Sequence, residues 1–405
     1  MKRADLLSLC PLAVTLAIAG CNAGGNTSLP TTVRQSAVAQ GHPIPEWQAK
    51  HLAQAACPAV GPGEGQCAAL VMNEGAGPAT TPGGWGPSDF RAVYKLPSSS
   101  KGSGEIIGIV DAYDNPNVAS DLAQYRSTFG IPRAKFHKYN QQGEQSNYPP
   151  GDKGWGFEID LDVEMVSAAC PKCTIYLIEA TNNSLRNLGR AVERATKLGA
   201  HIVSNSWGCY STGCTWKTTD FDRPNVTYLA AAGDLAYGSF PPAQFANVIS
   251  VGGTVLAKNG SHYSETVWRD TSGACAPNIP KPSWQQDPGC STRTANDVAA
   301  VSFNVAEYDS YLYGGWVRAE GTSAATPLLA SAFALAGNVT KHYTGELFWT
   351  LPKKQLKKDL HVISSGSNGC PASLQGSYLC TAGTGQFGTY SGPTGWGTPN
   401  GIGAF

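Results

Sequence analysis

Stretches typical of buried strands alternate with stretches typical of amphipathic helices through the middle of the chain. The segments 105–111 and 173–179 are largely continuous apolar runs that end in an acid, as expected of strands covered on both faces. Helical spacing of apolar residues follows each run, at 115–129 and 184–198. The alternation predicts an α/β fold with an open parallel sheet and helices on both of its faces. Shorter strands are predicted at 202–204, 226–232 and 247–252.

The composition limits the partners of such a fold. Lysine and arginine together number 29, as do aspartate and glutamate, so the net charge is zero and nothing favours nucleic acid as a partner. Only 14% of the residues are charged, against roughly 25% in typical soluble domains. Two interpretations stay open. The chain is a rigid, loop-rich extracellular protein, or its surface is suited to acid because few carboxylates are present to protonate.

The first 20 residues have the layout of a signal peptide. Lys2 and Arg3 precede an apolar stretch at 6–19, which is excluded from the fold. Small residues directly before Cys21 resemble a bacterial lipobox, so Cys21 is a candidate lipid anchor, with ordinary cleavage nearby as the alternative. We expect an exported protein, either a lipoprotein of the bacterial cell envelope or an extracellular protein.

Two segments of different amino-acid composition follow the signal peptide. Residues 21–85 are rich in small residues and proline, with one short apolar patch at 68–72, and we interpret them as a loosely structured leader or pro-segment. Residues 86–405 carry the strand and helix signals and are interpreted as one domain. No stretch after the signal has the ~20 apolar residues that a transmembrane helix needs.

The cysteines also indicate export. Apart from Cys10 and Cys21, ten cysteines fall into five pairs that are local in sequence, which predicts small-loop disulfides formed in an oxidising compartment. One pair, Cys170 and Cys173, forms a CxxC motif, but neither a thioredoxin-like setting nor a second CxxC accompanies it, so a structural disulfide is favoured over a redox or zinc site. The pairs are 57 and 67, 170 and 173, 209 and 214, 275 and 290, and 370 and 380.

The first motif that contains a candidate catalytic residue is Gly321-Thr-Ser-Ala-Ala-Thr-Pro327, which leads into an apolar stretch. A serine at the start of a helix often only caps free backbone N–H groups. The functional alternative is that Ser323 is a nucleophile whose own N–H contributes to an oxyanion hole. This motif alone does not decide between the two.

The second motif is a predicted helix with acids at every other position from 158 to 164. At about 100° per residue, Glu158 and Asp162 share one face with apolar residues, within about 60° of each other. Asp160 and Glu164 fall nearly opposite with Ser167, a face that we interpret as solvated. Two carboxylates one turn apart beside a core repel each other unless they share a proton or have a partner, so Glu158 and Asp162 are the candidate functional pair.

The third motif is Ala230-Ala-Ala-Gly-Asp234, at the end of a strand of small residues. An Asp before a loop is commonly a turn residue. Its placement at the carboxyl edge of a parallel sheet, where ligands bind, is the functional alternative.

These three motifs occur together, in this order, in the sedolisin family of serine-carboxyl peptidases, which this sequence resembles over about residues 86–405. Also similar are the segments Ser204-Asn-Ser-Trp-Gly208 and Gly395-x-Gly-Thr-Pro-Asn-Gly401. The resemblance implies a subtilisin-like fold with a single catalytic domain. It also implies a serine-type endopeptidase that acts on polypeptides at acid pH, as a monomer.

Carried over residue by residue, the resemblance assigns Ser323 as nucleophile, Glu158 as general base, Asp162 as the residue that orients Glu158, and Asp234 as the oxyanion-hole acid. The chemistry is consistent, because a carboxylate with a pKa near ~4.3 can accept a proton in acid where histidine is already charged. A protonated Asp234 can donate a hydrogen bond to an oxyanion.

Alternative functions account for fewer of these motifs. Ordinary subtilisin chemistry would use Asp111, but none of the seven histidines has a suitable motif, and no Gly-x-Ser-x-Gly elbow is present. A glycosidase built on Glu158 and Asp162 leaves the other two motifs without a role. From a different class, the chain could be an inactive surface-binding lipoprotein that keeps a subtilisin-like fold.

The resemblance further implies a calcium ion near the C-terminus, held by two Asp side chains and backbone carbonyls. In this sequence the corresponding positions read Val362 and Ser391, although the first alignment is loose and Asp359 and His361 lie close. Calcium draws its affinity largely from carboxylate charge. We therefore expect the calcium site to be lost, with no other cofactor, and a Cys370–Cys380 disulfide to hold this region instead.

Overall fold

The computed structural model describes residues 52–73, 79–211, 214, 216–337 and 341–405. The predicted signal peptide and Cys21 lie outside these residues. Within them, no helix is long and apolar enough to span a membrane.

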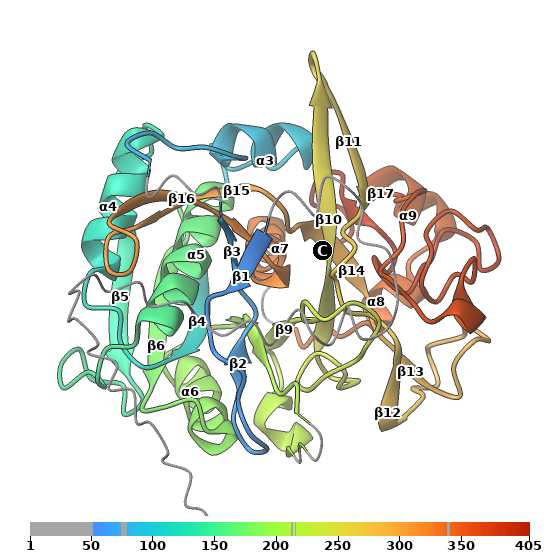
Figure 1. The fold of residues 1–405 in the computed structure, drawn as a ribbon, viewed down its shortest axis with the longest axis horizontal. Helices are drawn as coiled ribbons and strands as arrows, with labels where there is room; N and C mark the ends of the chain where they lie inside the picture. The colour runs from blue at the N-terminus through green and yellow to red at the C-terminus, as the bar shows by residue number, and fades with distance from the viewer. Residues whose placement is uncertain (1–51, 74–78, 212–213, 215, 338–340) are drawn as a thin grey trace, which may run out of the picture.

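An eight-stranded sheet forms the centre of the molecule (Figure 1). Its neighbours run in the order β11-β10-β9-β7-β4-β6-β5, with β14 also paired to β10. All of these pairings are parallel except the hairpin of β10 and β11 at one edge. The bounds are β4 Ile106–Ala112, β5 Lys135–Asn140, β6 Thr174–Ala180, β7 Ile202–Asn205, β9 Thr227–Ala231, β10 Ile249–Asn259, β11 His262–Val267 and β14 Val298–Val301.

Helices cover both faces of this sheet, as the sequence predicted. On one face, α5 (Lys153–Ala169) and α7 (Thr322–Ala336) pack against each other and against the central strands. On the other, α6 (Leu185–Lys197) lies so close to β4 that a side chain at Gly108 would meet the Cβ atom of Ala195 at 3.1 Å. The remaining helices are α3 Pro87–Val93, α4 Val118–Thr128, α8 Glu346–Thr350 and α9 Lys353–Asp359, with 3-10 turns η1 Thr218–Phe221 and η2 Ala372–Leu374.

A second sheet of four strands, in the order β1-β3-β16-β15, lies beside α4 and α5. Its strands are β1 Leu52–Ala55, β3 Leu70–Asn73, β15 Val305–Asp309 and β16 Gly315–Glu320. The other strands form pairs: β2 Gln66–Cys67 with β8 Trp207–Gly208, β12 Cys275–Pro280 with β13 Thr292–Thr294, and β17 Leu360–His361 with β18 Thr398–Pro399.

The N-terminal strands correct one expectation. Residues 21–85 were expected to be loosely structured, but β3 pairs with β16, and β2 pairs with β8. A disulfide between Cys57 and Cys67 closes the loop between β1 and β2. Strands of two to four residues carry too little hydrophobic periodicity to be detected in a sequence rich in Gly and Pro. In the described part of this segment, residues 52–73 therefore belong to the folded body.

All five predicted disulfides form. The bond between Cys170 and Cys173 confirms the structural interpretation of the CxxC motif. The others join Cys209 to Cys214, Cys275 to Cys290, and Cys370 to Cys380.

Candidate active site

Helix α5 presents the first two candidate residues. It begins at Lys153 after Asp152, whose side chain accepts a 2.9 Å hydrogen bond from the Trp155 N–H and so caps the helix. Glu158 and Asp162 lie one turn apart, and neither has any exposed surface. The helix thus carries two carboxyl groups into the interior, where an ionised group without a partner is costly.

Ser323 lies in the first turn of α7, and the backbone before it explains the Gly-Thr-Ser motif. Gly321 has φ of +138°. A Cβ atom at Gly321 would lie 2.2 Å from the carbonyl oxygen of Ala68 and 2.8 Å from Oδ2 of Asp234. Only glycine fits between these two groups, so the approach of α7 to Asp234 depends on it.

Ser206, which follows β7, connects three parts of the site. Its hydroxyl donates a 2.7 Å hydrogen bond to Oδ1 of Asp162. Its carbonyl oxygen accepts a hydrogen bond from the Ala68 N–H at 3.0 Å and a longer one, 3.4 Å, from the Ser323 hydroxyl. Asp162 is therefore held in place by Ser206, and the same residue positions the Ser323 hydroxyl.

Glu158 is close to the Ser323 hydroxyl but is not hydrogen-bonded to it in this arrangement. Both Glu158 oxygens lack a hydrogen-bond partner among the described residues. Burial raises the pKa of Glu158 well above its ordinary value, and repulsion from Asp162 and Asp111 raises it further, while the Ser323 hydroxyl acts in the opposite direction. A small rotation of Ser323 away from the Ser206 carbonyl would join the two groups, because the current bond is long and weak.

Asp111, at the end of β4, belongs to the same cluster. It is fully buried, neither of its oxygens has a hydrogen-bond partner in the described structure, and burial raises its pKa to about 8. Its charge raises the pKa of both Glu158 and Asp162. The sequence singled out Asp111 only for subtilisin-type chemistry. Its position at the end of a buried strand was the signal that could have placed it beside the helical pair.

Asp234 follows β9 on the other side of Ser323. One oxygen, Oδ1, accepts hydrogen bonds from the N–H and the hydroxyl of Thr322, both at 2.8 Å. The other, Oδ2, is enclosed and has no hydrogen-bond partner among the described residues, although the residue as a whole is partly exposed. Burial raises the pKa of Asp234 to about 8, and the bonds from Thr322 only partly oppose this. A protonated Oδ2 would be a hydrogen-bond donor aimed beside Ser323.

The segment 66–69, which we call the covering segment, lies against this site. Its strand β2 pairs with β8, directly after Ser206, and the N–H of Ala68 bonds to Ser206. The Ala68 carbonyl faces Gly321. Ser323 has no exposed surface in this arrangement.

The opposite face of α5 corrects a second expectation. Asp160, Glu164 and Ser167 were expected to be solvated, but all three are fully buried. Helix α4 and strand β15 cover this face, and polar groups meet the acids: the Asn115 side chain donates to Asp160 at 2.7 Å, and the Tyr308 N–H donates to Glu164 at 3.0 Å. Charge periodicity cannot distinguish a face that meets water from one that meets another polar layer.

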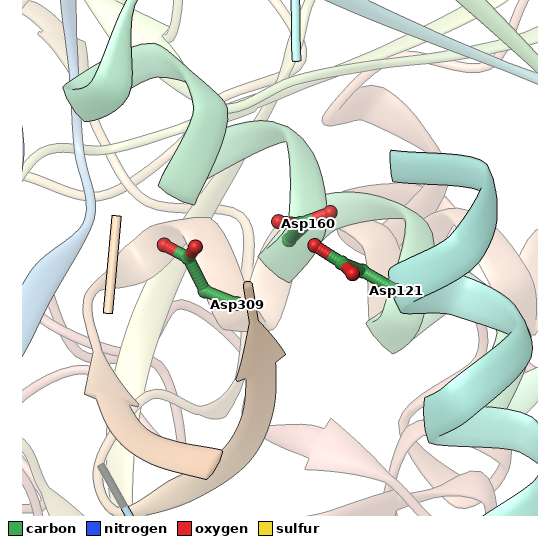
Figure 2. A group of neighbouring side chains, drawn as sticks. All are labelled: Asp121, Asp160 and Asp309. Carbon is green, nitrogen blue, oxygen red and sulfur yellow. The ribbon is translucent and has the colours of Figure 1, made fainter. Parts of the chain in front are cut away.

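Further acids from neighbouring elements join this back-face cluster, which comprises Asp121, Asp160, Glu164, Glu307 and Asp309. In Figure 2, Asp121 from α4 and Asp309 from β15 flank Asp160. Carboxylate oxygens of these three residues lie within 4.8 Å of one another. Such a set of oxygens is what a hard cation such as calcium prefers, so these are the described residues that could hold a metal.

The expected C-terminal calcium positions do not offer such oxygens. Val362 has an apolar side chain that is 38% exposed. Ser391 is buried, and its hydroxyl is bonded to that of Thr394 at 2.8 Å. Asp359 lies beside Gly403, where an added Cβ atom would meet its carboxylate at 2.4 Å. The two aligned positions, Val362 and Ser391, therefore bring no carboxylate to a calcium ion.

Comparison with known proteins gives related results from sequence and from structure. The profile of the subtilase family matches residues 147–395. Kumamolisin of Bacillus sp. (strain MN-32) is 30% identical over 334 residues, covering 72% of this chain and 58% of kumamolisin. Sedolisin of Pseudomonas sp. (strain 101) is 24% identical over 370 residues, covering 79% of this chain and 60% of sedolisin.

A structure of Pseudomonas sedolisin, a serine-carboxyl proteinase complexed with two molecules of pseudo-iodotyrostatin, matches with a TM-score of 0.64 and 22% identity, covering 79% of this chain and 96% of that one. This likeness establishes the subtilisin-like fold predicted from the sequence. The chain spans less than two thirds of the length of either curated relative.

Proposed function

Because the chain belongs to the subtilase family, and within it to the sedolisin type of serine-carboxyl peptidase, we propose that it is a serine-type endopeptidase that hydrolyses peptide bonds of proteins. The observation that carries the proposal is the Ser323 hydroxyl beside the buried Glu158–Asp162 pair, with Asp234 on its other side. A structural serine at a helix start would need none of these acids.

In the proposed reaction, the Ser323 oxygen attacks the scissile carbonyl carbon and Glu158 accepts the hydroxyl proton. Asp162, fixed by Ser206, orients Glu158. The tetrahedral oxyanion accepts a hydrogen bond from protonated Asp234. Glu158 then returns the proton to the leaving amine, and water resolves the acyl-enzyme by the same steps.

The protonation of Asp234 supports activity in acid, whereas the raised pKa of Glu158 lowers the fraction of the base that is charged there. Burial raises the pKa of all three carboxyl groups of Glu158, Asp162 and Asp111, and repulsion from neighbouring acids raises those of Glu158 and Asp162 further, so at low and neutral pH the three groups hold fewer than three charges between them. Glu158 serves as base in the fraction of molecules where it carries the charge. Asp234 keeps its proton up to about pH 8, which extends the donor beyond the range of a free aspartic acid.

The covering segment supports a zymogen-like state. A substrate strand cannot reach Ser323 while Ala68 is bonded to Ser206 and packed on Gly321. Residues 52–73 would have to be released or displaced first. Incubation at pH 4 should give a lag in activity that ends as a fragment preceding Pro87 is lost, whereas Ser323→Ala should stay intact. Full activity without a lag, with residues 52–73 retained, would contradict this role.

We also propose export, with polypeptides as substrates and Cys21 as the possible lipid attachment point. Five disulfides support an oxidising compartment.

The test of the activity is protein hydrolysis from pH 3 to 7 by wild type and Ser323→Ala. A matched control is Ser331→Ala, which removes another buried hydroxyl of α7, one that only bonds to the Pro327 carbonyl at 2.9 Å. Activity should disappear in the first variant and persist in the second. Equal hydrolysis by wild type and Ser323→Ala would overturn the proposal.

A further inference from the structure

A cavity of about 510 Å³ lies on the side of the central sheet where β4, β5 and β6 begin. Its lining comes from α3, the loop before β4, the loop after α4 and the Cys170–Cys173 loop. Asp111 lies in the last two residues of β4, and Ser206 and Asp234 follow β7 and β9, so all three are at the opposite, carboxyl ends of the strands. The cavity is therefore separate from the candidate active site, and its volume is in the range of small-molecule sites.

Four cations line this cavity, and its lining contains no acid. They are Arg91, Arg133, Lys135 and Lys172. None of the four makes an ion pair with another residue in the described ranges, whereas exposed Arg223, for example, is bonded to a glutamate at 2.7 Å. In a chain with zero net charge, this is a local concentration of positive charge.

Arg126, which is buried behind the cavity lining, adds to this positive charge. Arg126 is 2% exposed, and its guanidinium donates to the carbonyls of Pro132 and Pro171, both of which line the cavity, and to the Ser167 hydroxyl at 2.8 Å. No carboxylate among the described residues bonds to it, and burial lowers its pKa to about 10. A buried charge with only neutral partners is costly, and an anion in the cavity would offset that cost.

Neutral donors stand at the rim. Ser99 and Ser103 are exposed and line the cavity, so their hydroxyls can reach a ligand there. The guanidinium groups of Arg91 and Arg133 suit tetrahedral oxyanions, which they can bind through two parallel hydrogen bonds.

We propose that this cavity is a binding site for a phosphate or sulfate group, either a free ion or the end of an ester. The choice among anions rests on the proposed acid working range. Carboxylate ligands lose their charge near pH ~4, whereas phosphate and sulfate groups keep at least one charge there, and the cavity cations stay protonated throughout.

The test measures binding, not hydrolysis, so its result is independent of the proposed activity. Inorganic phosphate, inorganic sulfate and phenyl phosphate are titrated into the full chain at pH 4.5 and 7 by calorimetry, at constant ionic strength set with chloride. The probe variant is Arg133→Gln with Lys172→Gln, both exposed positions at which folding should be unaffected. The control is Lys353→Gln with Lys354→Gln, which changes the net charge equally at exposed positions of α9.

We expect saturable binding that the cavity variant weakens at least about tenfold, since it loses two charge-assisted contacts. The control should bind like wild type. Equal affinity for phosphate and phenyl phosphate would identify a free ion as the ligand, and tighter binding of phenyl phosphate would identify an ester. No saturable binding, or the same weakening in both variants, would overturn the site.

Discussion

The two faces of α5 both carry buried acids, yet their surroundings differ. On the front face, Glu158 and Asp162 meet hydroxyl groups, those of Ser323 and Ser206. On the back face, Asp160 and Glu164 meet an amide side chain and a backbone N–H. Burial raises the pKa of all four carboxyl groups well above their ordinary values.

The comparison shows that a perturbed acid is not enough to identify a catalytic residue. Buried carboxyl clusters also occur where nothing reactive is near, and there they act through stability. The front face of α5 differs from the back face because the Ser323 hydroxyl, at the start of α7, lies beside it and can become a nucleophile. The predictions below either separate the roles of the two faces or show that they are the same.

The largest difference is expected in activity. Glu158→Gln should lower kcat by about 10²- to 10⁴-fold, because it removes the general base while keeping the shape of the side chain. Asp160→Asn, on the back face of the same helix, should change kcat only a few-fold. Steady-state kinetics at pH 4 on folded variants is the measurement. If both variants lost activity alike, the front face would have no special role.

A smaller effect is expected at Asp234. Because its pKa is about 8, it donates below that pH and loses the donor proton above it. Asp234→Asn keeps a donor that does not titrate, so it should retain part of the activity and weaken the decline on the alkaline side. Asp234→Ala should lose about 10²-fold below pH 8, where wild type still has the donor proton, as expected when an oxyanion donor is removed. A wild-type optimum above pH 7 would contradict the account of shared protons.

The fold was predictable because its main signal is local. Continuous apolar runs such as 106–112 and helical spacing such as 185–197 are read directly from the residues that form them. Ser323, Glu158, Asp162 and Asp234 were likewise predicted as candidates from motifs, and the structure places them near one another, while their catalytic roles stay predictions. Asp111 and the covering segment were missed in their present positions, since both depend on contacts between segments far apart in sequence.

The burial of the back face was not predictable for a related reason. Whether Asp160 meets water depends on β15, which lies almost 150 residues later in the chain and brings Glu307 and Asp309 toward it. A polar stripe on a helix indicates only that something polar faces it.

The back face should control the pH dependence of stability. Glu307 is fully buried, and its oxygens lack hydrogen-bond partners among the described residues. Burial raises its pKa well above the ordinary value. Repulsion raises it further, from Asp309 of β15 and from three acids of α5: Glu158, Asp160 and Glu164. Also facing this cluster are Tyr125 and Asp121 from α4.

A carboxyl whose pKa is raised on folding stabilises the protein fully below its unfolded pKa and loses that contribution as pH rises through the folded pKa. The free energy of unfolding should therefore fall above pH ~4, by up to about 1.4 kcal/mol per pH unit for one such group. Glu307→Gln, which imitates the protonated form, should flatten this slope. Melting temperatures from pH 3 to 8 test it, with exposed Glu346→Gln as control. Parallel curves for wild type and Glu307→Gln would contradict it.

The smallest effect is expected from metal removal. Val362 and Ser391 offer no carboxylate to calcium and the proposed mechanism has no step through a metal, so we expect EDTA to leave melting temperature and activity nearly unchanged. Reduction should lower both, since a disulfide such as Cys370–Cys380 contributes ~2–4 kcal/mol by restricting the unfolded chain. A large fall with EDTA that calcium restores would show a metal site. If Asp160→Asn no longer responded to EDTA and calcium, the metal site would be placed at Asp121, Asp160 and Asp309.

The central claim is that Ser323 becomes a nucleophile through the front face of α5. Its most direct test is acid-quenched mass spectrometry after mixing with a p-nitrophenyl ester of a short acylated amino acid, on chains from which residues 52–73 have first been cleaved by active wild type at pH 4. In wild type and Asp160→Asn, the peptide carrying Ser323 should gain the acyl mass, whereas Ser323→Ala and Glu158→Gln should show none. Acylation at another residue, or equal acylation of Ser323 in Glu158→Gln and wild type, would contradict the account.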